Sequence, residues 1–253
     1  MNKNTTLNKT KKIKKNKTRI TIILWLVIFF CISIFPAQSQ TRQIEVVLNW
    51  SSNAYVPLNY QGKALPTKGS AIEIVAQIIP KAITVNNLNF LWFLDGNLQK
   101  TASGLGKDVF KFISQKTIGY TYSIRLEVLD QENNIMTSDY QEIKLMEPQI
   151  VLETKIPPLD SSSLKKYRIN ANQRVNFIAQ PYFFNIKNLN SLEYFWKLGL
   201  KTASEINSDN SNIFTLTVGQ IAETIKQNLQ VWAQNKNQSY EKTQATAEIF
   251  LTP

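Results

Sequence analysis

The chain has 253 residues, with 29 Lys and Arg, 18 Asp and Glu, one Cys and no His, for a formal net charge of +11. The lack of histidine excludes a Ser-His-Asp triad, a Cys-His nucleophile and any His-ligated metal, and a single cysteine excludes a zinc knuckle, an iron–sulfur site and an intramolecular disulfide. We therefore predict a protein that is not an enzyme, with no catalytic residue, no bound metal and no cofactor.

The N-terminal segment has the composition of an export signal. Residues 1–19 carry eight basic residues and no acid, and the apolar run Ile20–Phe35 follows, ending before Pro36–Gln40 with its small residues Ala37 and Ser39. As a helix, this run of 16 residues spans about 24 Å, which is less than the hydrocarbon core of about 30 Å. A signal peptide cut after Ser39 is therefore favoured over an uncleaved membrane anchor. Both alternatives place the rest of the chain outside the cytoplasm, secreted or attached to the surface.

The basic charge is concentrated in that segment. Without residues 1–39, the chain keeps 21 basic and 18 acidic residues. The remaining 214 residues suit two domains of about 100 residues each, which we place at 40–147 and 148–253. The first has ten residues of each sign, and the second has eleven basic and eight acidic residues. Because nucleic-acid recognition needs a larger basic stripe, we predict no nucleic-acid partner.

Short segments alternate apolar and polar residues, which is typical of β-strands with one face on a core. Ala71–Ile79 and Ile124–Val128 are predicted strands, Asp95–Asn97 is a predicted turn, and Gln220–Gln227 is the only plausible helical turn. Six segments recur in order 101 to 106 residues later, which indicates an internal duplication. The pairs are Val75–Gln77 and Ile178–Gln180, Leu88–Trp92 and Leu192–Trp196, Lys100–Ser103 and Lys201–Ser204, Val109–Phe112 and Ile213–Leu216, Ile124–Asp130 and Leu229–Asn235, and Glu142–Leu145 and Glu248–Leu251.

Two motifs in the first copy resemble those of the PKD and immunoglobulin-like domains of bacterial cell-surface proteins. Trp92–Gly96 is similar to the W-x-F/L-D-G turn, and Tyr122–Asp130 is similar to the Y-x-V-x-L-x-V-x-D strand. The second copy departs from both, because Trp196–Gly199 lacks the Asp and Leu229–Asn235 lacks the leading Tyr. The resemblance implies an all-β fold of two tandem sandwiches, with Trp92 and Trp196 between the sheets.

Two groups of residues are candidate sites. The aromatic residues Tyr182, Phe183 and Phe184 form either an exposed binding platform for a glycan or a protein, or part of the core or the domain junction, which we favour because exposed apolar patches are rare. Several acidic residues near predicted turns either bind calcium or are solvated turn residues, and the sequence favours the latter. They are Asp95, Asp108, Asp130 and Glu132.

The expected function is that of an exported, non-enzymatic surface protein whose tandem modules act in adhesion, presentation or assembly of a surface structure. The alternative is a carbohydrate-binding or accessory module of a surface enzyme system. An enzyme with paired carboxylates is the third and weakest hypothesis. The ligand and the oligomeric state are not predicted.

Overall fold

The computed structural model describes residues 44–80, 84–162, 164–199, 201–202 and 212–253. The segment 1–39, expected to be a signal peptide or anchor, lies outside these residues. The described residues form strands and only two short 3-10 helices, η1 (Val85–Asn87) and η2 (Leu189–Ser191). Across the described ranges, no helix has the length and apolar character needed to span a membrane.

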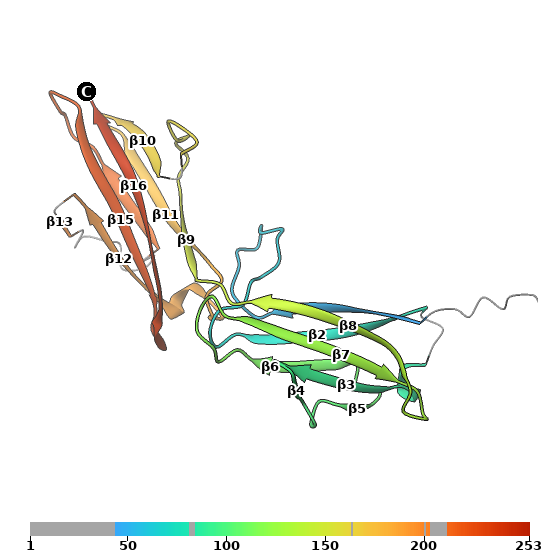
Figure 1. Ribbon diagram of the computed structural model, residues 1–253. Helices are drawn as coiled ribbons and strands as arrows, with labels where there is room; N and C mark the ends of the chain where they lie inside the picture. The colour runs from blue at the N-terminus through green and yellow to red at the C-terminus, as the bar shows by residue number, and fades with distance from the viewer. Residues whose placement is uncertain (1–43, 81–83, 163, 200, 203–211) are drawn as a thin grey trace, which may run out of the picture. The chain divides into compact units, whose positions relative to one another are not determined.

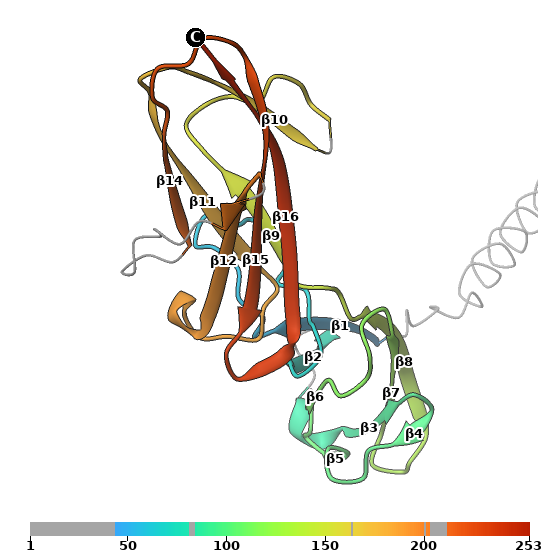
Figure 2. The same ribbon diagram turned by 90° about the vertical axis from the view of Figure 1, so that its left-hand side faces the viewer.

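Strands before residue 148 form two antiparallel sheets (Figure 2). One has the order β1-β2-β6 and the other β4-β3-β7-β8, with β5 paired to β3. The strands are β1 (Glu45–Ser52), β2 (Ala71–Ile79), β3 (Asn89–Leu94), β4 (Asn97–Leu98), β5 (Gly104–Leu105), β6 (Val109–Ile113), β7 (Thr121–Leu129) and β8 (Ile135–Lys144).

The later strands repeat this order. One sheet is β14-β11-β9, and the other is β10-β16-β15-β12-β13, in which β10 runs parallel to β16 along the sheet edge (Figure 1). The strands are β9 (Gln149–Glu153), β10 (Lys165–Asn170), β11 (Arg174–Tyr182), β12 (Leu192–Leu198), β13 (Lys201–Thr202), β14 (Ile213–Thr217), β15 (Ile225–Asn235) and β16 (Gln238–Thr252). Paired sheets with this strand order define an all-β, immunoglobulin-like sandwich fold.

Each pair of sheets encloses a hydrophobic cluster of its own, the first around Trp92 and the second around Trp196. Trp92 on β3 and Trp196 on β12 are 0% and 1% exposed, as expected for the tryptophan between the sheets. The Trp92 ring lies 5.6 Å from that of Phe110, and the Trp196 ring lies 5.4 Å from that of Phe214. The apolar residues of the alternating strands thus form the cores, and their polar neighbours face outward.

The sequence repeat has a counterpart in strand register. Ala76 on β2 pairs with Leu48 on β1, and Ala179 on β11 pairs with Leu152 on β9. The match Lys100–Ser103 with Lys201–Ser204 is an exception within the described residues. Lys100 lies in a turn after β4, whereas Lys201 begins β13 and pairs with Leu198. Lys100 and Lys201 are therefore not structurally equivalent, although they match in the sequence repeat.

Two sequence motifs have clear structural roles in the first half. Asp95 and Gly96 have φ values of 51° and 77° and join β3 to β4 in the two-residue hairpin turn that tolerates positive φ. The Tyr122 hydroxyl, at the start of β7, accepts hydrogen bonds from the backbone N–H groups of Gln115 and Lys116 at 2.9 and 3.1 Å. This contact is the tyrosine corner of immunoglobulin-like sandwiches.

The helical turn expected at Gln220–Gln227 is wrong. Residues 218–224 are irregular, and β15 begins at Ile225. The strand extends because Ile225 pairs with Leu251, so backbone hydrogen bonds to β16 replace the local bonds of a helix.

Candidate functional site

The outward side of the sheet β10-β16-β15-β12-β13 is the strongest candidate for a contact surface. We call it the C-terminal sheet face and define it by the outward residues of its strands. They are Glu193, Phe195 and Lys197 on β12, then Lys226, Asn228, Gln230, Trp232 and Gln234 on β15, Lys242, Gln244, Thr246, Glu248 and Phe250 on β16, and Lys166, Arg168 and Asn170 on β10. Their inward neighbours, such as Trp196 and Val231, are buried.

An aromatic pair lies across two strands of this face. Phe195 pairs in register with Trp232, and Trp232 pairs with Gln244 on the next strand. Phe195 is 53% exposed and Trp232 is partly exposed. Together with Lys242 they line an open hollow of about 490 Å³. Contiguous exposed apolar groups on a protein surface often mark an interaction site.

Amide and basic side chains surround the aromatic pair. Gln234 and Gln230 lie on either side of Trp232 along β15 and pair in register with Lys242 and Lys197, respectively. Lys197 and Gln230 also line a second hollow of about 800 Å³. The face therefore combines flat apolar rings with groups that both donate and accept hydrogen bonds.

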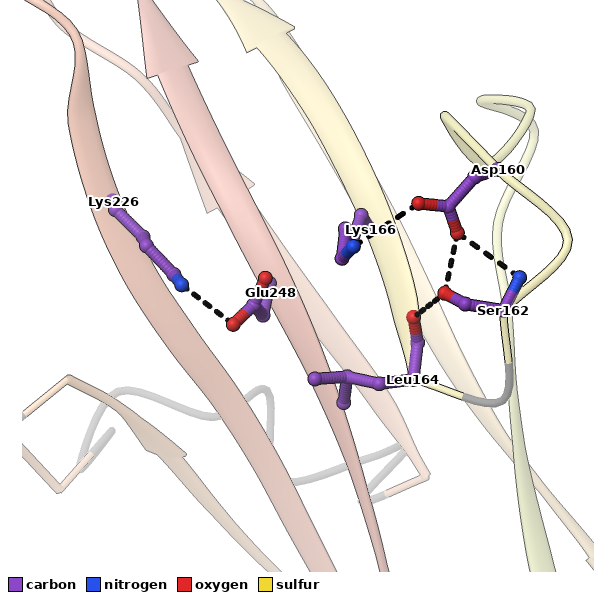
Figure 3. A network of polar contacts seen from close by, with 6 residues as sticks. All are labelled: Asp160, Ser162, Leu164, Lys166, Lys226 and Glu248. Carbon is purple, nitrogen blue, oxygen red and sulfur yellow. Dashed lines mark hydrogen bonds and ion pairs between the residues drawn. The ribbon is translucent and has the colours of Figure 1, made fainter.

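The C-terminal sheet face is positively charged. Its outward residues include five cations against two carboxylates, a net charge of +3. Some of these cations are neutralised: Lys226 pairs with Glu248 at 2.6 Å, and Lys166 with Asp160 at 3.1 Å (Figure 3). Lys197, Lys242 and Arg168 form no ion pair with any residue in the described ranges.

Asp160 anchors the loop before β10, at the edge of this face (Figure 3). Its carboxylate accepts hydrogen bonds from the Ser162 hydroxyl and from the Ser162 backbone N–H at 3.0 Å, and it pairs with Lys166. The Ser162 hydrogen bonds and Lys166 lower the pKa of Asp160 to about 2. The carboxylate is therefore ionised and held by protein donors at neutral pH.

The equivalent face of the first half is differently built. The Arg125 guanidinium lies 3.8 Å from the centre of the Phe93 ring and pairs with Glu127. This arrangement covers the outward aromatic ring and neutralises the cation. Tyr140 on β8 remains 51% exposed, and its hydroxyl donates a hydrogen bond to Glu142 at 2.9 Å. This face is formed by the outward residues of β3, β7 and β8, which include two cations and two carboxylates.

The aromatic residues singled out in the sequence lie elsewhere. Phe183 is 5% exposed and Phe184 is fully buried, with Phe184 in the second hydrophobic cluster. Phe183 and Phe184 exchange two backbone hydrogen bonds of 2.7 Å with Tyr55. Tyr182 is partly exposed, and its ring meets the Tyr60 ring edge-on at 5.5 Å. These rings pack against a segment between β1 and β2, so only Tyr182 offers an accessible ring.

Of the four carboxylates considered for calcium, Asp130 and Glu132 share a turn in which both accept a hydrogen bond from the Asn134 amide, whereas Asp95 and Asp108 lie in other loops. Asp95 accepts hydrogen bonds from the Tyr120 hydroxyl at 2.9 Å and from the Ser123 backbone N–H at 3.0 Å. Asp130 accepts hydrogen bonds from the backbone N–H and side-chain amide of Asn134 and from the backbone N–H of Glu132, and these bonds lower its pKa. Over the described ranges, no cluster of three or more His, Cys, Asp or Glu residues is arranged to hold a metal ion.

The C-terminal sheet face was not predicted from the sequence, although the alternating pattern of β15 indicates it. Along β15, Leu229, Val231 and Ala233 are buried, so Trp232 falls among the outward residues. A tryptophan on the polar side of an alternating strand is the informative exception to the pattern.

No protein-family model matches this chain, and no curated protein sequence is significantly similar to it. Among solved structures, it is similar to three N-terminal domains of the highly immunogenic outer capsid protein of bacteriophage RB49, with 15% identity, a TM-score of 0.42, and coverage of 82% of this chain and 59% of that one. It is also similar to fibronectin(III)-like modules of Clostridium thermocellum CbhA, with 13% identity, a TM-score of 0.27, and coverage of 81% and 94%.

A third similar structure contains immunoglobulin domains 1–5 of Sidekick-1, with 10% identity, a TM-score of 0.29, and coverage of 82% of this chain and 39% of that one. The chain thus spans less than two thirds of the length of the phage and Sidekick-1 fragments. At such identities and TM-scores, the similarity indicates no ligand, partner or activity.

Proposed function

We propose that this chain is an exported, non-enzymatic module that binds a partner outside the cytoplasm through the C-terminal sheet face. Such a role agrees with the composition, because the chain lacks histidine and its single cysteine lies in the predicted export segment. The rigid sheet holds the contact residues in fixed positions, so binding needs little ordering of side chains.

The observation that carries this proposal is the pairing of exposed Phe195 with partly exposed Trp232 on a face whose other outward residues, apart from Phe250, are polar. Aromatic residues at the centre of a surface, with polar side chains around them, are typical of contact hot spots. The first half supports this interpretation by contrast, because Arg125 there covers Phe93. Adhesion or presentation at a surface is the favoured use of this face.

The alternative, a carbohydrate-binding or accessory module, is favoured by the amide side chains around Trp232. Gln230, Gln234 and Gln244 provide both donors and acceptors, which suits the paired hydroxyls of a sugar. Both alternatives place the contact on the same residues and differ only in the partner.

The test is a binding experiment with the full chain purified in mild detergent. The wild type and the double variant Phe195→Ser, Trp232→Ser are applied to arrays of extracellular proteins and surface polysaccharides. We expect the wild type to bind a subset of probes and the double variant to lose that binding. Tyr140→Ser, which removes a similarly exposed ring from the first half, is the matched control and should bind normally.

Phe195 and Tyr140 are more than half exposed, so their removal should change the free energy of unfolding by less than about 1 kcal/mol, whereas removal of the partly buried Trp232 ring also loses buried apolar area. Folding is therefore checked by thermal melting of each variant. Retained binding by the double variant, loss of binding only in the Tyr140 variant, or no binding by the wild type would each overturn the proposal.

A further inference from the structure

We propose that the ligand of the C-terminal sheet face is an acidic polysaccharide, an inference that rests on the proposed function of this face. The chain of sugars would lie along the strands over Phe195 and Trp232, with its anionic groups near Lys197 and Lys242. Three properties of the face lead to this class of ligand: its flat aromatic centre, its amides and its unpaired cations.

The aromatic centre suits the face of a sugar ring. Phe195 and Trp232 are register partners on adjacent antiparallel strands, so their Cβ atoms are about 4.5–5.5 Å apart. The face of an aromatic ring is negative, and the C–H groups on one side of a pyranose are weakly positive. A sugar ring can therefore lie flat on this pair while its hydroxyls point outward to the neighbouring side chains.

The amides are placed where those hydroxyls would lie. Gln230 and Gln234 are two residues before and after Trp232 on the outward side of β15, and Gln244 is the register partner of Trp232 on β16. An amide donates through its nitrogen and accepts through its oxygen, so one side chain satisfies two adjacent hydroxyls. A protein-binding surface would instead be expected to be depleted in lysine and glutamate, whereas Lys197, Lys242 and Glu193 surround this centre.

The unpaired cations favour a ligand that carries negative charge. Lys242 lines the hollow that contains Phe195 and Trp232, and Lys197 lines the adjoining one. Neither forms an ion pair with a residue in the described ranges, whereas Lys226 and Lys166, farther along the face, each pair with a carboxylate. The cations nearest the aromatic pair are therefore available to a ligand.

The face also continues beyond the aromatic pair. Phe250 and Lys226 are register partners six residues along the strands from Gln244 and Trp232, a distance of about 20 Å at about 3.3 Å per residue. Lys226 lies over the Phe250 ring at 5.8 Å. The length from Trp232 to Phe250 suits a polymer of several sugar residues better than a monosaccharide.

The experiment compares polymers that differ only in charge. The full chain is titrated with polygalacturonate and hyaluronan, and with the same polymers after their carboxylates are reduced to alcohols. We expect the acidic forms to bind at least tenfold more tightly, and their binding to weaken as the salt concentration rises from 0.05 to 0.5 M, because salt screens exposed charges.

The variants separate charge from stacking. Lys197→Gln with Lys242→Gln should weaken binding of the acidic polymers roughly 5- to 20-fold and leave binding of the reduced polymers unchanged. Trp232→Ser should weaken binding of both by about 30-fold or more. Lys144→Gln, an exposed lysine on the outward side of β8, is the control and should change neither.

The outcomes distinguish this inference from the proposed function. Equal binding of acidic and reduced polymers, or no effect of the double lysine variant, would overturn the acidic ligand and leave the contact surface intact. Failure of all the polysaccharides, together with protein binding that Trp232→Ser abolishes, would overturn the glycan and again leave the surface intact. Binding that Trp232→Ser does not affect would overturn both.

Discussion

Removing either buried tryptophan should melt one core and leave the other. Trp92 is fully buried against Phe110, and its indole N–H donates a hydrogen bond to the Lys107 carbonyl at 2.9 Å. Truncating a buried tryptophan to alanine costs about 3–5 kcal/mol, and the lost hydrogen bond adds about 1 kcal/mol. Since a domain is stable by only about 5–15 kcal/mol, Trp92→Ala should lower the melting temperature of the first core by more than about 10 °C.

The assay is differential scanning calorimetry of the full chain, in which we expect two transitions. Trp196→Ala should lower the transition that Trp92→Ala spares. In Trp92→Ala, the free energy of unfolding of the second core should fall by no more than the contribution of the two hydrogen bonds in the Tyr55–Phe184 bridge, which is about 1–3 kcal/mol. Trp232→Ala, on the strand next to Trp196 but on the outward side of the sheet and only partly buried, should lower stability by less than either core variant. A single transition that neither core variant moves would refute the model of two cores.

Three further predictions concern single side chains. Tyr122→Phe leaves two backbone N–H groups without their acceptor, so the first transition should lose about 1–3 kcal/mol in denaturant titrations, whereas Tyr140→Phe, at an exposed hydroxyl, should lose almost nothing. Burial raises the pKa of Glu241, which is 1% exposed, so the folded state holds a proton that the unfolded state releases, and this stabilisation is lost as pH rises above 4.5. The stability of the wild type relative to Glu241→Gln should therefore fall from pH 4 to 8, and a constant difference would contradict this. Asp95 raises the pKa of Tyr120, so Asp95→Asn should lower that pKa toward 10 in an ultraviolet titration, and an unchanged pKa would show that Asp95 is not the cause.

The fold was largely predictable because it depends on local patterns. The alternation in Ile124–Val128 requires a strand with one face on a core, and Trp92 and Trp196 occupy the centres of the two cores as predicted. The turn at Asp95 was predictable because Asp-Gly favours the positive φ values of a tight hairpin. These features need only near neighbours in the chain.

The candidate site was less predictable because it depends on pairing between distant strands. Phe195 and Trp232 are 37 residues apart in the sequence, and only the register of β12 with β15 brings them together. The Tyr182–Phe184 cluster attracted attention because its aromatic residues are consecutive. Its contacts with Tyr55 and Tyr60 come from residues more than 100 positions away, which no local pattern indicates.

The bridge between Tyr55 and Phe184 has a consequence for the evolution of the molecule. Tyr55 precedes β2, yet its side chain packs against the second hydrophobic cluster, and Asn185 donates a hydrogen bond to the Gly69 carbonyl at 2.9 Å. If the halves arose by gene duplication, they are no longer interchangeable units. A recombination event that moved residues 148–253 alone into another gene would remove Tyr55, leaving the Phe183 N–H without its acceptor and apolar surface uncovered. Selection should therefore keep the pair together, even while the loops and outer faces of each half diverge.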